Sequence, residues 1–131
     1  MLKAIEKALL LQELDLLRFA SADHLMLLAE AGREVVFRKG DAIFRAGNPS
    51  STFYLLLLGR AAIAGADGLV VEKTALNLRS CLTNVEHSAA CICIEDCTAL
   101  AFETPDLLDL LAGEPELSLA MLKYFVSEIK R

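Results

Sequence analysis

Between residues 34 and 103 the sequence is a series of short apolar segments separated by turn residues. The segment "TFYLLLLG" (52–59) is a continuous apolar run stopped by Gly59, a pattern typical of a strand buried on both faces. Turns are expected at Lys39-Gly40-Asp41, Gly47-Asn48-Pro49, Asp67-Gly68 and Glu95-Asp96. The predicted strands are 34–38, 42–45, 52–58, 60–64, 69–72, 88–94 and 97–103. Short strands that recur about every 8–12 residues predict an antiparallel sandwich or barrel.

Helical patterns flank this region at its N-terminal side, over residues 1–31. Apolar residues three and four positions apart predict an amphipathic helix over 4–17; they are Ile5, Leu9, Leu10, Leu14 and Leu17. Ser21 is a typical N-cap and Gly32 a typical C-terminal glycine, so a second helix is expected over 22–31. Its buried face should hold Leu25, Leu28 and Ala29.

Two further helices are expected over 105–131. Thr104 followed by Pro105 resembles an N-cap and first helical position, and this helix should stop at Gly113. Pro115 then opens a last helix, whose apolar residues spread around more than one face. A helix of that kind suits partial burial plus contact with a partner, so we expect it as a candidate homodimer contact. Together the 131 residues predict one domain, with helices at 1–31, a β-sandwich at 34–103 and helices at 105–131.

Charge and motif content narrow the function classes. The formal net charge is −5 and the basic residues are scattered, which argues against direct nucleic-acid binding. No apolar run is long enough to span a membrane, and Glu6, Lys7, Glu13 and Asp15 interrupt the apolar N-terminus. We therefore expect a cytoplasmic protein without membrane insertion. The sequence carries no G-x-S-x-G elbow, P-loop or H-E-x-x-H motif, so no catalytic residue is assigned and an enzyme is not expected.

Two segments, 14–63 and 87–111, resemble the cyclic nucleotide-binding domain family of bacterial catabolite-activator regulators, kinase regulatory subunits and gated channels. The residues that carry the resemblance are Phe37, Gly40, Ile43, Gly47, Tyr54 and Gly59. The resemblance implies a mainly β fold, an antiparallel double-stranded β-helix (jelly roll) of eight strands flanked by N- and C-terminal helices. It also implies a regulatory or ligand-sensing role, as an effector domain of a larger protein.

The sequence departs from this family where the family binds the cyclic phosphoribose. Family members use a Phe-Gly-Glu cassette and, some nine residues later, an Arg that pairs with the phosphate. Alignment back from "HSAA" places Asn77 at the Gly, Leu78 at the Glu and His87 at the Arg. Because a hydrogen bond to a charged group contributes roughly 1.5–3 kcal/mol, losing both groups should weaken cyclic-nucleotide binding strongly. Cyclic nucleotide is therefore disfavoured as a ligand, and no other cofactor is expected.

An alternative is that the cassette region still senses a nucleotide or another small anion. Backbone amides would then act together with Arg79 and His87. The candidate binding residues of this degenerate cassette are Asn77, Leu78, Arg79, Ser80, His87, Ser88 and Ala89. A short helix whose N–H groups point into an open pocket would favour a sensor, whereas a collapsed loop that fills the pocket with Leu76, Leu78 or Leu82 would favour a module that binds no ligand.

The four cysteines lie within residues 81–97, without a C-x-x-C spacing. Cys91 and Cys93 alternate along a predicted strand, so both should point to one face, and the family resemblance places that face inside the barrel. We expect them to pack as small apolar side chains and predict no metal site. A thiol or metal redox sensor is the alternative that the cysteines leave open.

Overall fold

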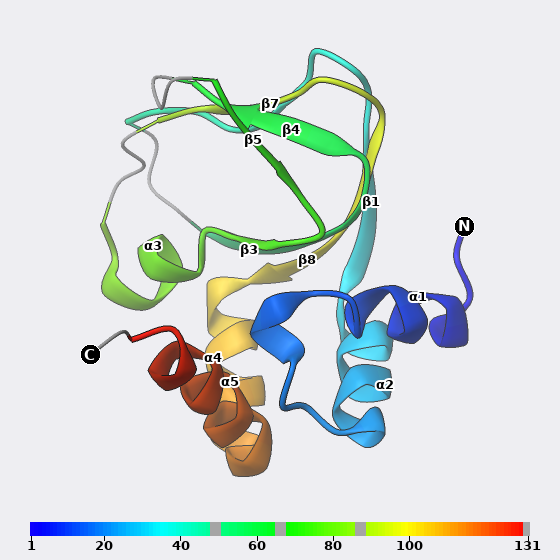
Figure 1. Cartoon of the computed structure of the whole chain (residues 1–131), viewed down its shortest axis with the longest axis vertical. Coiled ribbons are helices and arrows are strands. Elements are labelled where there is room, and N and C mark those ends of the chain that lie inside the picture. Colours follow the sequence, from blue (N-terminus) through cyan, green and yellow to red (C-terminus); the bar gives the residue numbers. More distant parts are fainter. Residues whose placement is uncertain (48–50, 65–67, 86–88, 130–131) are drawn as a thin grey trace.

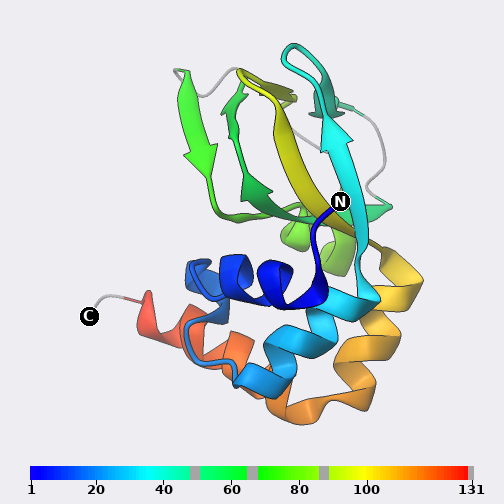
Figure 2. The same cartoon turned by 90° about the vertical axis from the view of Figure 1, so that its right-hand side faces the viewer.

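The computed structural model describes residues 1–47, 51–64, 68–85 and 89–129. Within them the chain forms two four-stranded antiparallel sheets, with strand orders β1-β8-β3-β6 and β2-β7-β4-β5 (Figures 1 and 2). The strands are β1 (Arg33–Phe37), β2 (Ala42–Phe44), β3 (Thr52–Leu58), β4 (Arg60–Ile63), β5 (Leu69–Glu72), β6 (Ala75–Leu76), β7 (Cys91–Cys93) and β8 (Cys97–Glu103). The predicted jelly roll with flanking helices is confirmed.

The flanking helices gather below the barrel, and one short helix lies beside it (Figure 1). The helices are α1 (Ala4–Leu11), the 3-10 helix η1 (Asp15–Leu17), α2 (Ala22–Ala31), α3 (Leu78–Thr83), α4 (Thr104–Gly113) and α5 (Pro115–Ser127). None of the helices in the described part of the chain has the length and apolar character needed to cross a membrane.

β3 divides the apolar core into two parts. Its odd-numbered residues Phe53, Leu55 and Leu57 belong to a core shared with the helices, while Leu56 belongs to the core inside the barrel. Successive side chains of a strand point to opposite faces, so a strand between two cores must be apolar throughout. The prediction that 52–58 is buried on both faces is therefore confirmed, apart from Leu58 at its exposed end.

The prediction of one helix over 4–17 is wrong. α1 ends at Leu11, and the chain turns before η1. Ile5 is 57% exposed and Leu9 is 55% exposed, so these two leave the predicted buried face. Leu14 and Leu17 are buried as predicted, and Ala8, Leu11 and Leu16 are buried with them. After this turn η1 packs against α5.

The N-cap of α2 is confirmed, but the role of its final glycine differs from the expected one. Ser21 Oγ accepts from the His24 N–H at 3.2 Å, and the Ser21 N–H donates to His24 Nδ1 at 3.3 Å. Gly32 has an ordinary φ of −76°, so it is not a left-handed cap. A Cβ on Gly32 would lie 2.7 Å from the Phe102 ring, which shows that the close approach of β8 excludes a larger residue.

The start of α4 also differs from the prediction. Thr104 is the first helical residue, and its hydroxyl donates to the Ser51 carbonyl at 3.0 Å instead of capping the helix. Pro105 does occupy the first turn. α5 ends at Ser127, earlier than expected, and residues 130–131 lie outside the described part.

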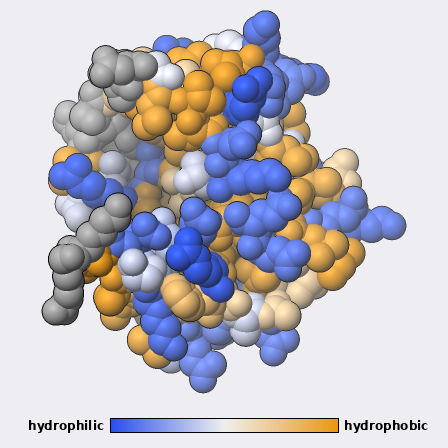
Figure 3. Space-filling view, viewed as in Figure 1, coloured by the Kyte–Doolittle hydropathy of each residue, from blue (hydrophilic) through white to orange (hydrophobic). Residues whose placement is uncertain are grey.

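The outer face of the second sheet carries an apolar row across four strands. The strand register aligns Ala42 with Ile92, Ile92 with Ala62, and Ala62 with Val70. Val70 is 47% exposed at the edge strand β5. Figure 3 shows the corresponding apolar area at the top of the molecule, over these strands. The predicted β4–β5 hairpin is present, although most of its turn (65–67) lies outside the described residues.

Candidate functional site

The cassette region folds as a tight turn followed by a short helix. β6 ends at Leu76, Asn77 adopts a left-handed φ of +75°, and α3 begins at Leu78. The Asn77 side-chain amide donates to the Thr52 carbonyl at 3.1 Å, which ties the turn to β3. Asn is among the few residues other than Gly that visit the left-handed region routinely. Asn77 can therefore keep the backbone turn at the position where the family has Gly.

The leucines on either side of Asn77 pack into different cores. Leu76 is 7% exposed and packs inside the barrel, whereas Leu78 packs against the helical core, as does Cys81 further along α3. Leu82 is exposed on the outside of α3. The region thus meets each expectation only in part: a short helix forms, and Leu76 alone of the three leucines fills the barrel. The side chain at the family's Glu position lies on the helical side of the turn.

The remaining candidate residues are only partly brought together. Arg79 is exposed, and its carbonyl accepts a hydrogen bond from Thr83 Oγ1 at 2.6 Å. Ser80 and Ala89 are half-buried. His87 and Ser88 lie outside the described residues, so their predicted part in the site stays a prediction.

The barrel interior is apolar. Its buried members are Ile43, Leu56, Ala61, Leu76, Cys91, Cys93, Cys97 and Ala99. Phe37 and Tyr54 pack against them half-buried, with ring centroids 5.8 Å apart in an edge-to-face arrangement. Burial is the main cause that raises the pKa of the Tyr54 phenol. Every arginine in the described ranges is exposed, so none of them supplies a buried cation to this interior.

Phe37 and Tyr54 line the barrel interior, a role that was not predicted from the sequence. Both residues had served only to identify the fold. Alternation along 52–58 could have found Tyr54, because it shares a face with Leu56. Phe37 carries no comparable signal, since β1 lies at a sheet edge and its neighbour Val36 is 55% exposed.

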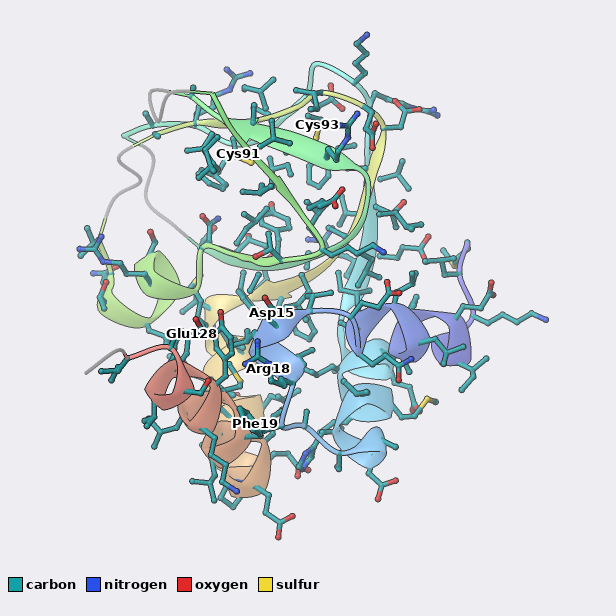
Figure 4. All side chains as sticks on the ribbon, in the orientation of Figure 1. Asp15, Arg18, Phe19, Cys91, Cys93 and Glu128 are labelled. Carbon is teal, nitrogen blue, oxygen red and sulfur yellow. The ribbon has the colours of Figure 1, made fainter. Side chains whose placement is uncertain are left out.

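The predicted inward packing of the strand cysteines is confirmed. Cys91 is 0% exposed and Cys93 is 2% exposed, and both belong to the barrel core beneath β7 (Figure 4). The Cys97 thiol donates to the carbonyls of Arg60 and Glu95, each at 3.4 Å. All four cysteines are free thiols. Among the described residues, no group of three His, Cys, Asp or Glu side chains is placed to hold a metal ion.

We expect the two β7 thiols to react very slowly in the folded protein. Burial raises the pKa of Cys91 from 9.0 to about 11 and that of Cys93 to about 12. Because the thiolate is the nucleophile, labelling at pH 8 should be at least roughly a hundredfold slower than in the unfolded chain. Because burial penalises the thiolate, the titration of these thiols leaves the stability of the fold unchanged below pH 9.0 and lowers it as the pH rises from 9.0 through about 11 for Cys91 and about 12 for Cys93.

Labelling with Ellman's reagent, in a Cys81→Ala background that removes the thiol on α3, measures these rates. Urea should release the three remaining thiols. Fast labelling of Cys91 or Cys93 without urea would contradict the expectation and would favour the thiol-sensor alternative.

A family model described as "Cyclic nucleotide-binding domain" matches residues 34–114, which is more than half of the chain. The chain belongs to the cyclic nucleotide-binding domain family. The match runs from β1 into α4 and so includes the cassette region of this cyclic nucleotide-binding domain. Among curated proteins, none matches the chain significantly.

Solved structures share the fold at low sequence identity. The N-terminal domain of a transcriptional regulator from Streptomyces coelicolor is 21% identical, with a TM-score of 0.75 over 90% of this chain and 88% of that one. The sensor domain of the regulator DNR from Pseudomonas aeruginosa is 22% identical, with a TM-score of 0.71 over 98% of this chain and 96% of that one. A regulatory subunit of a cAMP-independent protein kinase A from Trypanosoma brucei is 24% identical, with a TM-score of 0.71. The match covers 85% of this chain and 43% of the Trypanosoma chain, whose mutant is bound to cAMP.

Proposed function

We propose that this domain is a regulatory or interaction module that does not bind cAMP or cGMP tightly, and that it works in the cytoplasm as an effector domain of a larger protein. The observation that carries the proposal is the placement of Leu78. Its aliphatic side chain packs against the helical core, so the position that should accept from a ribose hydroxyl offers no acceptor. The apolar barrel interior supports the same conclusion, because an anionic phosphate needs paired charge or hydrogen-bond donors when buried.

The Trypanosoma kinase subunit offers a precedent within the same fold. It is described as cAMP-independent, and the cAMP-bound structure is that of a mutant carrying three substitutions. A fold of this type can therefore serve a kinase regulatory subunit that works without cAMP. We propose that the present domain likewise acts through contacts with other protein segments and has no catalytic role.

Isothermal titration with cAMP and cGMP tests the proposal. We expect no binding at micromolar concentrations for the native chain. A variant with Asn77→Gly, Leu78→Glu and His87→Arg should gain roughly 10²–10⁴-fold in affinity, because two charge-assisted interactions of roughly 1.5–3 kcal/mol each are restored. Leu82→Glu is the matched control, since it adds a carboxylate on the exposed side of α3. Circular dichroism would verify that each variant folds.

A micromolar or tighter dissociation constant for native protein would overturn the proposal. Such a result would favour the second candidate function, a sensor of a nucleotide or another small anion. The formation of α3 behind Asn77 is the observation that favours that candidate. Binding that survives Arg79→Ala and His87→Ala would remove these two side chains as its basis. We place the thiol or metal sensor last, because burial raises the pKa of the strand thiols.

We also propose that α5 can pair with a second copy of this chain. Leu119, Leu122 and Val126 are each at least half exposed and follow one another at spacings of three and four. This spacing is that of coiled-coil positions that pair between identical helices. Together with Phe19 on the neighbouring segment they line an almost entirely apolar groove of about 410 Å³. A second helix of the same kind would cover this groove.

A further inference from the structure

A separate cavity lies outside the barrel, where η1 and α5 meet the chain between β5 and α3. Its volume is about 260 Å³, and its walls include Asp15, Glu72, Lys73, Leu78, Tyr124 and Phe125. The volume corresponds to roughly nine water molecules at about 30 Å³ each. It is slightly below the range of about 300–1,000 Å³ that is usual for pockets holding drug-sized ligands. The cavity therefore has room for a small ligand of about nine non-hydrogen atoms.

One side of the cavity is aromatic. The rings of Tyr124 and Phe125 lie with centroids 5.3 Å apart and planes at 61°. Phe125 lines the cavity and is 45% exposed. The Arg18 guanidinium already lies 5.6 Å from the centroid of Tyr124. Aromatic faces attract cations through their quadrupole, and this wall already holds one cation in that way.

The charges around the cavity leave an excess of carboxylates. Arg18 lies 3.7 Å from Asp15 and 3.7 Å from Glu128, and Figure 4 shows these three residues together where η1 meets α5. Lys73 forms an ion pair with Glu13 at 2.9 Å, and this contact raises the pKa of its ammonium group.

Glu72, which also lines the cavity, makes no ion pair with any described residue. Its carboxylate is a fourth one, beside those of Asp15 and Glu128, which pair with Arg18, and that of Glu13, which pairs with Lys73. Glu72 also acts electrostatically on Lys73 and on Arg60, which is itself paired with Glu95. The charged side chains that line the cavity, Asp15, Glu72 and Lys73, together favour a positively charged ligand, because carboxylates outnumber ammonium groups among them.

We infer that this cavity is a binding site for a small organic ammonium ion that carries an aromatic or other apolar group. The ammonium group would lie near the Glu72 and Asp15 carboxylates, where it gains charge-assisted hydrogen bonds. The apolar group would lie against Phe125 and the Leu78 side chain. The site is separate from the barrel interior and does not depend on whether the barrel binds a nucleotide.

The position of the cavity gives such a ligand a regulatory effect. Leu78 belongs to α3, Glu72 to β5, Asp15 to η1 and Phe125 to α5, so an occupant contacts four elements at once. A ligand that binds only the folded arrangement stabilises it in proportion to its occupancy. The ligand would therefore hold α5 and α3 in the relative position that the structure shows.

Phenethylamine is the probe for this proposal, and amide chemical shifts of the full chain report its site. We expect saturable shifts at residues 72–78 and 124–125, with a dissociation constant on the order of 1 mM or tighter. 3-Phenylpropionate has a similar size and the opposite charge, and butylamine lacks the ring. Both should bind at least roughly tenfold more weakly, since each loses one of the two interactions.

Glu72→Gln should weaken phenethylamine binding by roughly fivefold, because it removes a carboxylate from the cavity wall but keeps the shape of the side chain. Glu30→Gln on α2 is the matched control and should leave the binding unchanged, since Glu30 is exposed and does not line the cavity. Equal binding of 3-phenylpropionate, unchanged affinity in Glu72→Gln, or shifts confined to the β7 strand would each overturn the inference. A cAMP titration reports on the barrel alone, so the two proposals can fail separately.

Discussion

Gly59→Ala is expected to destabilise the domain by about 2–5 kcal/mol, the sum of a backbone and a packing cost. Gly59 has a φ of +91°, a conformation that costs an L-residue about 1–2 kcal/mol. A Cβ would also lie within 2.7 Å of Cys97 Sγ and even closer to the Asp96 carbonyl oxygen. Relieving that overlap requires a shift of backbone in β8, and overpacking of this kind costs typically about 1–3 kcal/mol. Urea denaturation followed by circular dichroism measures the loss.

Gly40→Ala is a closely matched control for the backbone part of this cost. Gly40 has the same φ of +91°, but nothing lies within 4 Å of the position that its Cβ would take. The control should therefore lose only about 1–2 kcal/mol, from strain alone. Equal losses in the two variants would show that the approach of the Asp96–Cys97 backbone to Gly59 is not the reason for a glycine there.

The strands could be predicted because their signals are local. A strand between two cores is apolar throughout, as in 52–58, and turn residues mark the ends of its neighbours. Gly59 shows the limit of this approach. The sequence predicts that it ends β3, but the residues that exclude a side chain are Asp96 and Cys97, far along the chain. Tertiary approach of that kind leaves no local pattern.

The prediction of one N-terminal helix over 4–17 was wrong for a different reason. The many leucines of this segment form a wide stripe, which is compatible with several helical phases and with a break. The break after Leu11 is decided by tertiary packing, since η1 must reach α5. Neighbouring elements determine which leucines become buried, and this information is absent from the periodicity of the segment.

The candidate site was predictable in its chemistry and not in its geometry. The absence of a Gly-Glu pair at Asn77 and Leu78 is visible in the sequence once the family pattern is applied. That Asn77 keeps the left-handed turn, and that Leu76 and Leu78 enter different cores, depends on side-chain directions at a turn. A turn breaks the regular alternation on which strand predictions rest.

Leu117→Ala is expected to lower the free energy of unfolding by about 2–5 kcal/mol, since it leaves a cavity in the core. Leu117 is 0% exposed and belongs to the core shared by the helices and β3. It starts the buried stripe of α5, which continues through Ala120 and Met121. Thermal or urea unfolding at low protein concentration measures the loss for the monomer.

Leu122→Ala, the same substitution on the same helix, separates the two apolar stripes of α5. Leu122 is 56% exposed, so its loss should change the stability of the monomer by less than about 0.5 kcal/mol. Leu122→Ala should instead weaken self-association, measured by sedimentation equilibrium. Leu117→Ala should affect self-association only because it unfolds part of the protein. A native chain that stays monomeric at all accessible concentrations would contradict the proposed pairing of α5. A comparable loss of stability in both variants would mean that the outer stripe also packs within the domain, and α5 would then have no free face for a second copy.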